Sequence, residues 1–258
     1  MTATVARAAE IEPERTASGA LVTTVLDTRG VGGRLVRRLV EVPAGAAHAA
    51  AAGPGGELWF VISGTGELDC GAAGPGGSAG AGRPVGPDQG IWVPAGANYQ
   101  LRAAGPDPVR LDTVSLPGPG GSGGPAGSGA ADQRAGTPLV SDLGACEVEQ
   151  TGDRKFRVLL GPGRGCGAAT QFVGEIPPGQ APVHSHTYDE VVLILGGTGI
   201  AHVNGAQHPV APGTCVYLPP GQQHCLENTG RDTLLVLGVF QPGGSPAAKR
   251  VAPGEAAP

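Results

Sequence analysis

The chain contains the stretch Pro178-Gly-Gln-Ala-Pro-Val-His-Ser-His-Thr-Tyr-Asp-Glu190, which is followed further along by Pro219-Pro-Gly-Gln-Gln-His224. His184 and His186 are two residues apart, so on an extended strand their side chains leave by the same face. Glu190 opens an apolar run that predicts a buried strand, and His224 follows a Pro-Gly turn in a distant segment. Three neutral imidazoles and one carboxylate form a donor set for one divalent transition metal, namely iron, manganese, nickel, cobalt, copper or zinc.

These two segments resemble the two signature motifs of the cupin superfamily. The residues that match the first motif are Gly179, His184, His186, Glu190 and Gly197, although the gap after Gly179 is one residue short. The residues that match the second motif are Gly213, Pro219, Gly221, His224 and Asn228. The resemblance implies an all-β jelly-roll barrel, the double-stranded β-helix, with a metal in its mouth that is held by His184, His186, Glu190 and His224. His202 and His208 lie outside both motifs and are not expected to bind metal.

The sequence also contains an internal repeat. The stretch Glu41-Val-Pro-Ala-Gly45 resembles Glu175-Ile-Pro-Pro-Gly179, and Glu57-Leu-Trp-Phe-Val-Ile-Ser-Gly-Thr-Gly66 resembles Glu190-Val-Val-Leu-Ile-Leu-Gly-Gly-Thr-Gly199. In the same way, Val93-Pro-Ala-Gly96 resembles Leu218-Pro-Pro-Gly221. The chain is therefore identified as a bicupin, in which two jelly-roll barrels follow one another.

The first copy of the repeat departs from the ligand pattern. The positions that correspond to the three histidines hold Ala51, Gly53 and Tyr99, and only Glu57 remains. His48 stands nearby but is out of register with the motif. We therefore expect the first barrel to be packed and free of metal. The less favoured alternative is a site re-formed by His48, Glu57 and Tyr99.

Glycine and proline divide the chain into units, because these residues concentrate in a few stretches. The chain has 47 glycines and 25 prolines, which are concentrated in a loop insertion between Gly71 and Gly82, in a linker and in a tail, and which elsewhere mark turns between short strands. The predicted units are an N-terminal extension at 1–20, a degenerate cupin barrel at 21–116, a Gly/Pro/Ser-rich linker at 117–137, a metal-binding cupin barrel at 138–242 and a flexible tail at 243–258.

Charge and cysteine content restrict the partners. The formal net charge is −5 and no basic cluster stands out, so we expect neither nucleic acid nor a membrane surface as a partner. The five cysteines Cys70, Cys146, Cys166, Cys215 and Cys225 contain no Cys-x-x-Cys motif. That pattern, without an apolar run of signal-peptide length at the start, favours reduced thiols in a cytoplasmic protein. Cys225 is expected in the core, and homodimerisation is left open.

The resemblance implies a function but does not choose the reaction. We expect a metal-dependent enzyme that acts on a small, oxygen-chelating substrate, and a dioxygenase similar to the flavonol-cleaving cupins is the favoured oxidoreductase. In those cupins the residue at the position of Glu190 serves as ligand and as proton acceptor. The alternatives are an isomerase or decarboxylase of a sugar or carboxylic acid, or a non-catalytic bicupin that binds a small molecule.

Strand parity and charge suggest the surroundings of the site. The expected barrel walls are Phe172, Val173, Val192, Leu193, Ile194, Val216, Tyr217 and Leu218. Recognition of an anion requires a fixed cation, and the candidates are Arg154, Lys155, Arg157 and Arg164. Arg157 and Arg164 are weighed as substrate-binding residues, but ordinary solvated charge is the favoured interpretation of both.

Overall fold

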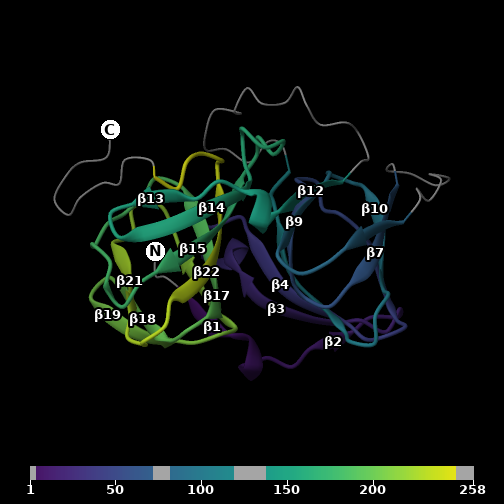
Figure 1. Cartoon of the computed structure of the whole chain (residues 1–258), viewed down its shortest axis with the longest axis horizontal. Coiled ribbons are helices and arrows are strands. Elements are labelled where there is room, and N and C mark those ends of the chain that lie inside the picture. Colours follow the sequence, from purple (N-terminus) through teal and green to yellow (C-terminus); the bar gives the residue numbers. More distant parts are fainter. Residues whose placement is uncertain (1–3, 72–81, 119–137, 248–258) are drawn as a thin grey trace.

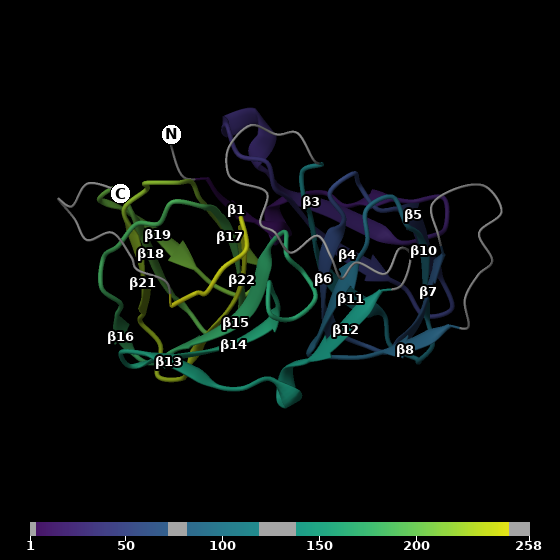
Figure 2. The same cartoon turned by 90° about the horizontal axis from the view of Figure 1, so that it is seen from above.

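The computed structural model describes residues 4–71, 82–118 and 138–247. These residues form two β-barrels that lie next to each other, each built from a seven-stranded and a four-stranded antiparallel sheet (Figures 1 and 2). The predicted all-β fold of two tandem jelly-roll barrels is confirmed. The predicted loop insertion, linker and tail lie almost entirely outside the described residues.

The first barrel occupies the purple to teal part of the chain in Figure 1. Its strands are β2 (Glu14–Arg15), β3 (Leu21–Asp27), β4 (Val36–Val42), β5 (Ala47–Ala51), β6 (Glu57–Ser63), β7 (Gly66–Gly71), β8 (Arg83–Val85), β9 (Gln89–Val93), β10 (Asn98–Ala103), β11 (Val109–Ser115) and β12 (Leu139–Asp142). The larger sheet has the order β12-β9-β6-β11-β4-β3-β2, and the smaller sheet has the order β5-β10-β7-β8.

The second barrel repeats this arrangement, mainly in the teal-green to yellow part of the chain, with one strand from its purple end. Its strands are β1 (Val5–Arg7), β13 (Glu149–Thr151), β14 (Arg154–Leu160), β15 (Thr170–Ile176), β16 (Gly179–Gln180), β17 (Asp189–Gly196), β18 (Gly199–Val203), β19 (Ala206–Val210), β20 (Thr214–Leu218), β21 (His224–Asn228) and β22 (Leu234–Gln241). The sheet orders are β1-β20-β17-β22-β15-β14-β13 and β16-β21-β18-β19. Three short 3-10 helices complete the described elements: η1 (Ala8–Glu10), η2 (Thr28–Val31) and η3 (Leu143–Ala145).

The two barrels exchange edge strands. Strand β1, which precedes the first barrel in the sequence, pairs with β20 of the second barrel. Strand β12 lies in the range predicted for the second barrel, yet it pairs with β9 of the first barrel. Each larger sheet therefore ends in a strand that covers its edge and links it to the other half of the chain.

The barrels also share one hydrophobic core. Val192 and Ile194 of β17 face the interior of the second barrel. Val191 and Leu193 lie on the opposite face of β17 and pack in a common core with Phe60 of the first barrel. Because side chains alternate between the two faces of a strand, both faces of β17 are buried. This explains why the sequence reads there as a continuous apolar run.

Buried polar groups cross the same interface. The guanidinium of Arg37 donates to both carboxylate oxygens of Asp112, over 2.7 and 3.0 Å. It also donates to the carbonyl oxygen of Leu237 in the second barrel, over 3.1 Å. The Gln171 amide donates in the other direction, to the carbonyl oxygen of Trp59 over 3.1 Å. These bonds connect the barrels at points where water has no access.

The five cysteines of the chain all lie within the described residues. All five cysteines are free, and four of them are buried. Cys225 lies in the core, as predicted, with its sulfur 3.3 Å from the Gln180 amide nitrogen. No helix within the described ranges is long and apolar enough to cross a membrane.

Candidate metal centre

The four predicted ligand residues come from three neighbouring segments of the second barrel. Glu190 is the second residue of β17 and shares its inward face with Val192. His224 begins β21, and His184 and His186 lie in the segment before β17. The backbones of His184 and His224 exchange two hydrogen bonds, of 3.0 and 2.8 Å. This pairing brings residues from the two sequence motifs side by side.

Backbone carbonyl groups orient two of the imidazole rings. Nδ1 of His184 lies 3.0 Å from the carbonyl oxygen of Pro182, and Nδ1 of His224 lies 2.8 Å from that of Gln222. Because a carbonyl oxygen can only accept, each Nδ1 must carry the proton. Nε2 of each ring therefore keeps the lone pair that a metal requires, and the second hydrogen bond fixes the ring orientation.

His186 and Glu190 approach each other closely. Nε2 of His186 lies 2.9 Å from Oε2 of Glu190, and both side chains are buried. Within the described part of the chain neither ring nitrogen of His186 has a partner in hydrogen-bonding geometry. Two donor atoms that are each about 2.1 Å from one ion, at a right angle, are about 3.0 Å apart. The spacing of this pair therefore fits two ligands of a shared ion.

His186, Glu190 and His224 form a compact and buried cluster. Their donor atoms lie within 4.8 Å of one another, which sets them apart from every other acidic, cysteine or histidine group in the described ranges. The half-buried His184 lies beside them, with its ring centroid 4.4 Å from that of His224. The residues present thus fit a transition metal, because a buried set of imidazole nitrogens and one carboxylate is what such an ion binds.

The electrostatics of the cluster keep the carboxylate ionised. Burial alone would raise the pKa of Glu190, but the contact with His186 and the charges of His224 and His184 outweigh it. The pKa of Glu190 consequently lies below its ordinary value. An ionised carboxylate is the form that binds a metal.

Aromatic stacking holds the His186 ring in place. The rings of His186 and Tyr188 stack with centroids 4.1 Å apart and planes inclined by 6°. Tyr188 stacks in turn on Phe240 of β22, with centroids 4.3 Å apart. Sequence spacing gives no sign of this role for Tyr188, since its contact with Phe240 joins segments that are distant in the chain.

A cavity of about 100 Å³ opens beside His184, Glu190 and His224. Among the predicted wall residues, Phe172, Val192 and Leu218 line it, Ile194 and Val216 lie deeper in the same core, and Val173, Leu193 and Tyr217 pack in the core shared with the first barrel. The last three residues therefore point away from the metal pocket, and their predicted place around it is corrected. Apolar residues occupy both faces of these strands, so the sequence could not show which face the cavity takes.

The cations at this cavity are Arg154 and Lys155 of β14. Arg157, a candidate substrate-binding residue from the sequence, is 2.8 Å from Glu175 in an ion pair, and Glu175 lines the cavity. Arg164 lies in a loop with its guanidinium 3.5 Å from the sulfur of Cys146.

In the first barrel, His48, Glu57 and Tyr99 line one cavity, whose volume is about 550 Å³. The prediction of a packed barrel is wrong here. Ala51 and Gly53, which replace two histidines of the motif, line the same cavity, and their small side chains leave this space open. The structure thus brings together the three residues of the alternative site.

Glu57 is held in a different way from Glu190. One oxygen of its carboxylate accepts from the indole nitrogen of Trp59 over 2.9 Å, and the other accepts from the hydroxyl of Ser115 over 3.2 Å. The Tyr99 hydroxyl lies 3.4 Å from Nε2 of His48. Both carboxylate oxygens of Glu57 are thus engaged by neutral donors.

Comparisons with known proteins agree with this architecture. Residues 172–240, which include Glu190 and His224, match the family described as Cupin domain. Protein Ylba from E. coli has a similar structure, with a TM-score of 0.70 and 12% identity, over 93% of this chain and 90% of that one. A mutant of oxalate decarboxylase OxdC from Bacillus subtilis has a TM-score of 0.73 and 14% identity, over 98% and 79%. The second barrel thus contains a match to the cupin domain, and the chain has the two-barrel fold of a bicupin, with a metal-site motif in its second barrel.

Two curated relatives match parts of the chain. An oxalate-binding protein from Thermotoga maritima is 36% identical over 68 residues, which are 26% of this chain and 56% of that protein. The HTH-type transcriptional activator RhaS from Shigella flexneri is 30% identical over 75 residues, which are 29% of this chain and 26% of that protein. The chain therefore spans about half of the first relative and about a quarter of the second.

Proposed function

We propose that the second barrel is the catalytic site of a metal-dependent enzyme that acts on a small organic acid. The observation that carries the proposal is the group of His186, Glu190 and His224, buried at a cavity that Arg154 and Lys155 also line. A metal-binding cluster and two cationic side chains at one small cavity suit a substrate that chelates through oxygens.

His184, His186, Glu190 and His224 would hold the ion. When bound, the metal supplies Lewis acidity, which polarises a carboxylate or carbonyl oxygen of the substrate. Arg154 and Lys155 attract and orient the acid at the cavity. Phe172, Val192 and Leu218 exclude water from the reacting centre, and an apolar surrounding of this kind strengthens each charge interaction inside it.

Cavity size selects among the candidate substrates. A volume of about 100 Å³ corresponds to about three water molecules at liquid density. That space suits an acid of a few carbon atoms better than a flavonol. Two relatives are named for oxalate, the smallest dicarboxylate, and they support the same substrate class.

The proposed reaction is cleavage of a carbon–carbon bond next to the chelated oxygens, with decarboxylation as the leading case. Glu190 and Glu175 are the two carboxylates that line the cavity, so the proposal assigns them the holding and transfer of protons. Oxidative cleavage of the dioxygenase type, favoured from the sequence, involves the same bond and differs by the consumption of dioxygen. The metal analysis described next also identifies the metal.

The test compares the native chain with His186→Ala, and uses His202→Ala as a matched control. His202 is a histidine of the same barrel whose Nε2 lies 2.7 Å from Glu227, outside the cluster. We expect about one equivalent of transition metal by plasma mass spectrometry in the native chain and in the control, and a loss of at least about tenfold in His186→Ala.

Carbon dioxide release and oxygen uptake are then measured with a panel of two- to four-carbon acids. Carbon dioxide release without oxygen uptake supports the decarboxylase, and release with uptake supports the dioxygenase. Saturable binding of an acid without any product would contradict the enzymatic proposal and favour a binding protein. Full metal content in His186→Ala would contradict the metal site itself.

A further inference from the structure

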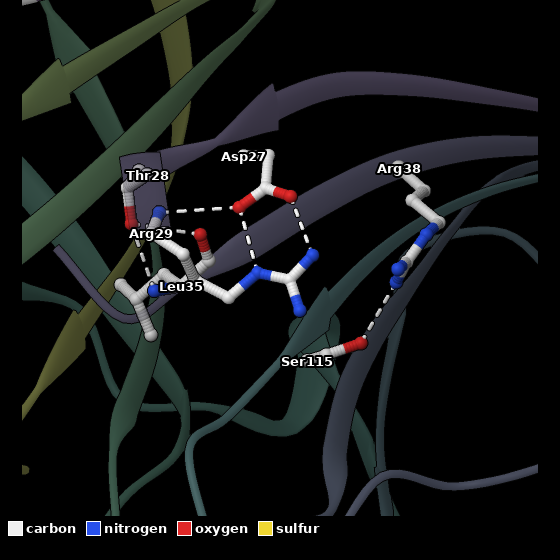
Figure 3. A network of polar contacts seen from close by, with 6 residues as sticks. All are labelled: Asp27, Thr28, Arg29, Leu35, Arg38 and Ser115. Atoms are coloured by element: carbon white, nitrogen blue, oxygen red, sulfur yellow. Dashed lines mark hydrogen bonds and ion pairs between the residues drawn. The ribbon is translucent and has the colours of Figure 1, made fainter. Parts of the chain in front are cut away.

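The cavity of the first barrel is lined by several positively charged side chains, which the comparison with the metal motif does not explain. Three arginines line it, Arg29 from η2, Arg34 from the turn that follows and Arg38 from β4. Figure 3 shows the guanidinium groups of Arg29 and Arg38 on either side of the Ser115 hydroxyl. Such convergence of arginines at one concave surface is suited to an anion.

A chain of hydrogen bonds fixes Arg38. Its Nη1 donates to the hydroxyl of Ser115 over 2.9 Å, and that hydroxyl donates to Glu57 over 3.2 Å. Trp59 donates to the other oxygen of Glu57. A guanidinium has five N–H groups, so the bond to Ser115 leaves donors that can reach a ligand. Glu57 thus helps to position an arginine in the first barrel. Its counterpart in the second barrel, Glu190, lies beside a histidine instead.

The charges around the cavity leave room for one anionic group. Arg29 forms an ion pair with Asp27, whose pKa is lowered by the bond with Arg29 and by the nearby charge of Arg38. Arg38 is bonded there to the neutral hydroxyl of Ser115, so its guanidinium can also face an anionic group of a ligand. One guanidinium pairs with one carboxylate, and the cationic side chains of the wall disfavour a metal ion.

His48 supplies a second and independent sign of a ligand. Its side chain is 8% exposed and lines the cavity, and its Nδ1 has no hydrogen-bond partner among the described residues. Burial and the charge of Arg38 lower its pKa, so the ring stays neutral. A buried ring nitrogen without a partner has a free-energy cost that a polar group of a ligand would remove.

Apolar residues line the remaining walls. Val22, Val36 and Val40 belong to the strands β3 and β4, and Leu116 follows β11. The volume of about 550 Å³ lies within the range of about 300–1,000 Å³ that is typical of small-molecule sites. An apolar wall opposite a cationic group fits an organic anion that has a hydrocarbon body.

We propose that the first barrel is a metal-free binding site for a small organic monocarboxylate. Arg38 holds the carboxylate beside His48, and the valine wall receives the apolar body. This inference is independent of the function proposed for the second barrel, because none of these residues belongs to the cluster of His186, Glu190 and His224.

The chain offers a fluorescent probe that lies in the first barrel. Its only two tryptophans, Trp59 and Trp92, both belong to that barrel, and Trp59 contacts the Glu57 and Tyr99 side chains that line the cavity. The full chain, treated with EDTA, is titrated with cyclohexanecarboxylate, and with cyclohexanecarboxamide as its neutral isostere. We expect a saturable change in tryptophan fluorescence with the acid, and binding at least about 10-fold weaker with the amide.

Variants test the assigned residues. Arg38→Gln should weaken binding of the acid by about 10- to 100-fold, whereas Arg110→Gln, an exposed arginine of the same barrel, should leave it unchanged. Ala50→Leu fills the cavity without removing a charge and should also reduce binding. Circular dichroism checks the fold of each variant.

Several results would overturn the proposal. They are the absence of saturable binding to the native chain, equal affinity for the amide, an equal loss in Arg110→Gln, or binding that disappears with EDTA. If Arg38→Gln does not fold, Ala50→Leu decides: unchanged binding in that variant would overturn the proposal.

Discussion

Glu57 and Glu190 stand at equivalent places in the two barrels, yet they meet different partners. Glu57 pairs across strands with Val93 at the end of β9, and Glu190 pairs with Leu218 at the end of β20. On the other side Glu57 faces Ser115, where Glu190 faces Phe240. The Ser115 hydroxyl binds the carboxylate of Glu57, whereas the Phe240 ring stacks on Tyr188 in the second barrel. The barrel is thus one scaffold, and a few side chains at its mouth decide what it binds.

The contrast extends to the space beside each carboxylate. In the second barrel, histidines and the Tyr188 ring fill the mouth and leave about 100 Å³. In the first barrel, small residues stand where the histidine pair would be, and about 550 Å³ remains. The first barrel therefore has the larger cavity, although the strand orders of the two barrels correspond.

The variant with the largest expected effect tests whether the two barrels, with their different sites, unfold as one unit. Asp112→Leu leaves the fully buried Arg37 without its carboxylate partner. Breaking a buried ion pair in this way costs about 3–5 kcal/mol of unfolding free energy. Urea unfolding is followed by tryptophan fluorescence, which reports on the first barrel, and by circular dichroism, which reports on both. Because the barrels share a core, we expect the two transitions to coincide and to shift together.

Two controls accompany this variant. Arg110→Gln removes an exposed ion pair, with Glu41 at 2.9 Å, and should change stability by less than about 1 kcal/mol. The double change Arg37→Leu with Asp112→Leu removes both charges and should recover much of the loss. A fluorescence transition that shifts while the circular dichroism transition stays in place would separate the barrels into independent units.

The sequence predicted the parts of the site that depend on local spacing. The alternation of His184 and His186, the strand that Glu190 opens and the turn before His224 are all local patterns, and their side chains do come together. The repeat predicted the second scaffold for the same reason. Each of these features depends on residues only a few positions apart.

Features that depend on long-range contacts could not be predicted. Arg37 and Asp112 pair across two strands, and nothing in the sequence near either residue indicates a partner. The exchange of β1 and β12 depends on which sheet edges lie open in three dimensions. Whether Val192 or Leu193 faces the cavity follows from the register of β17, since both residues are apolar and both faces are buried.

A set of variants with an intermediate expected effect on metal affinity tests what keeps a metal from binding in the first barrel. Ala51→His, Gly53→His and Tyr99→His rebuild the histidine set, and a Cβ atom at Gly53 meets no atom within 4 Å. The Glu57 carboxylate stays bonded to Trp59 and Ser115 in that variant. Adding Trp59→Val frees one oxygen, so we expect metal to bind about 10-fold more tightly. The titration uses a chain whose own cluster is removed by His186→Ala and His224→Ala, and equal affinities would show that the bonds of Glu57 are irrelevant.

The smallest expected effect is the pH dependence that His48 gives to the first barrel. Burial and the charge of Arg38 hold the pKa of His48 below its ordinary value. The unfolded chain therefore binds this proton more readily, and the contribution of the neutral ring to stability is lost as the pH falls below about 6.5 and through the folded-state pKa. In His48→Gln the ring is absent, so the loss of stability between about pH 7 and pH 5 should be smaller than in the native chain. The measurement is the midpoint of urea unfolding by tryptophan fluorescence at each pH. An equal dependence on pH in both chains would show that the cavity does not disfavour the charged ring, and it would weaken the contrast with the histidines of the second barrel.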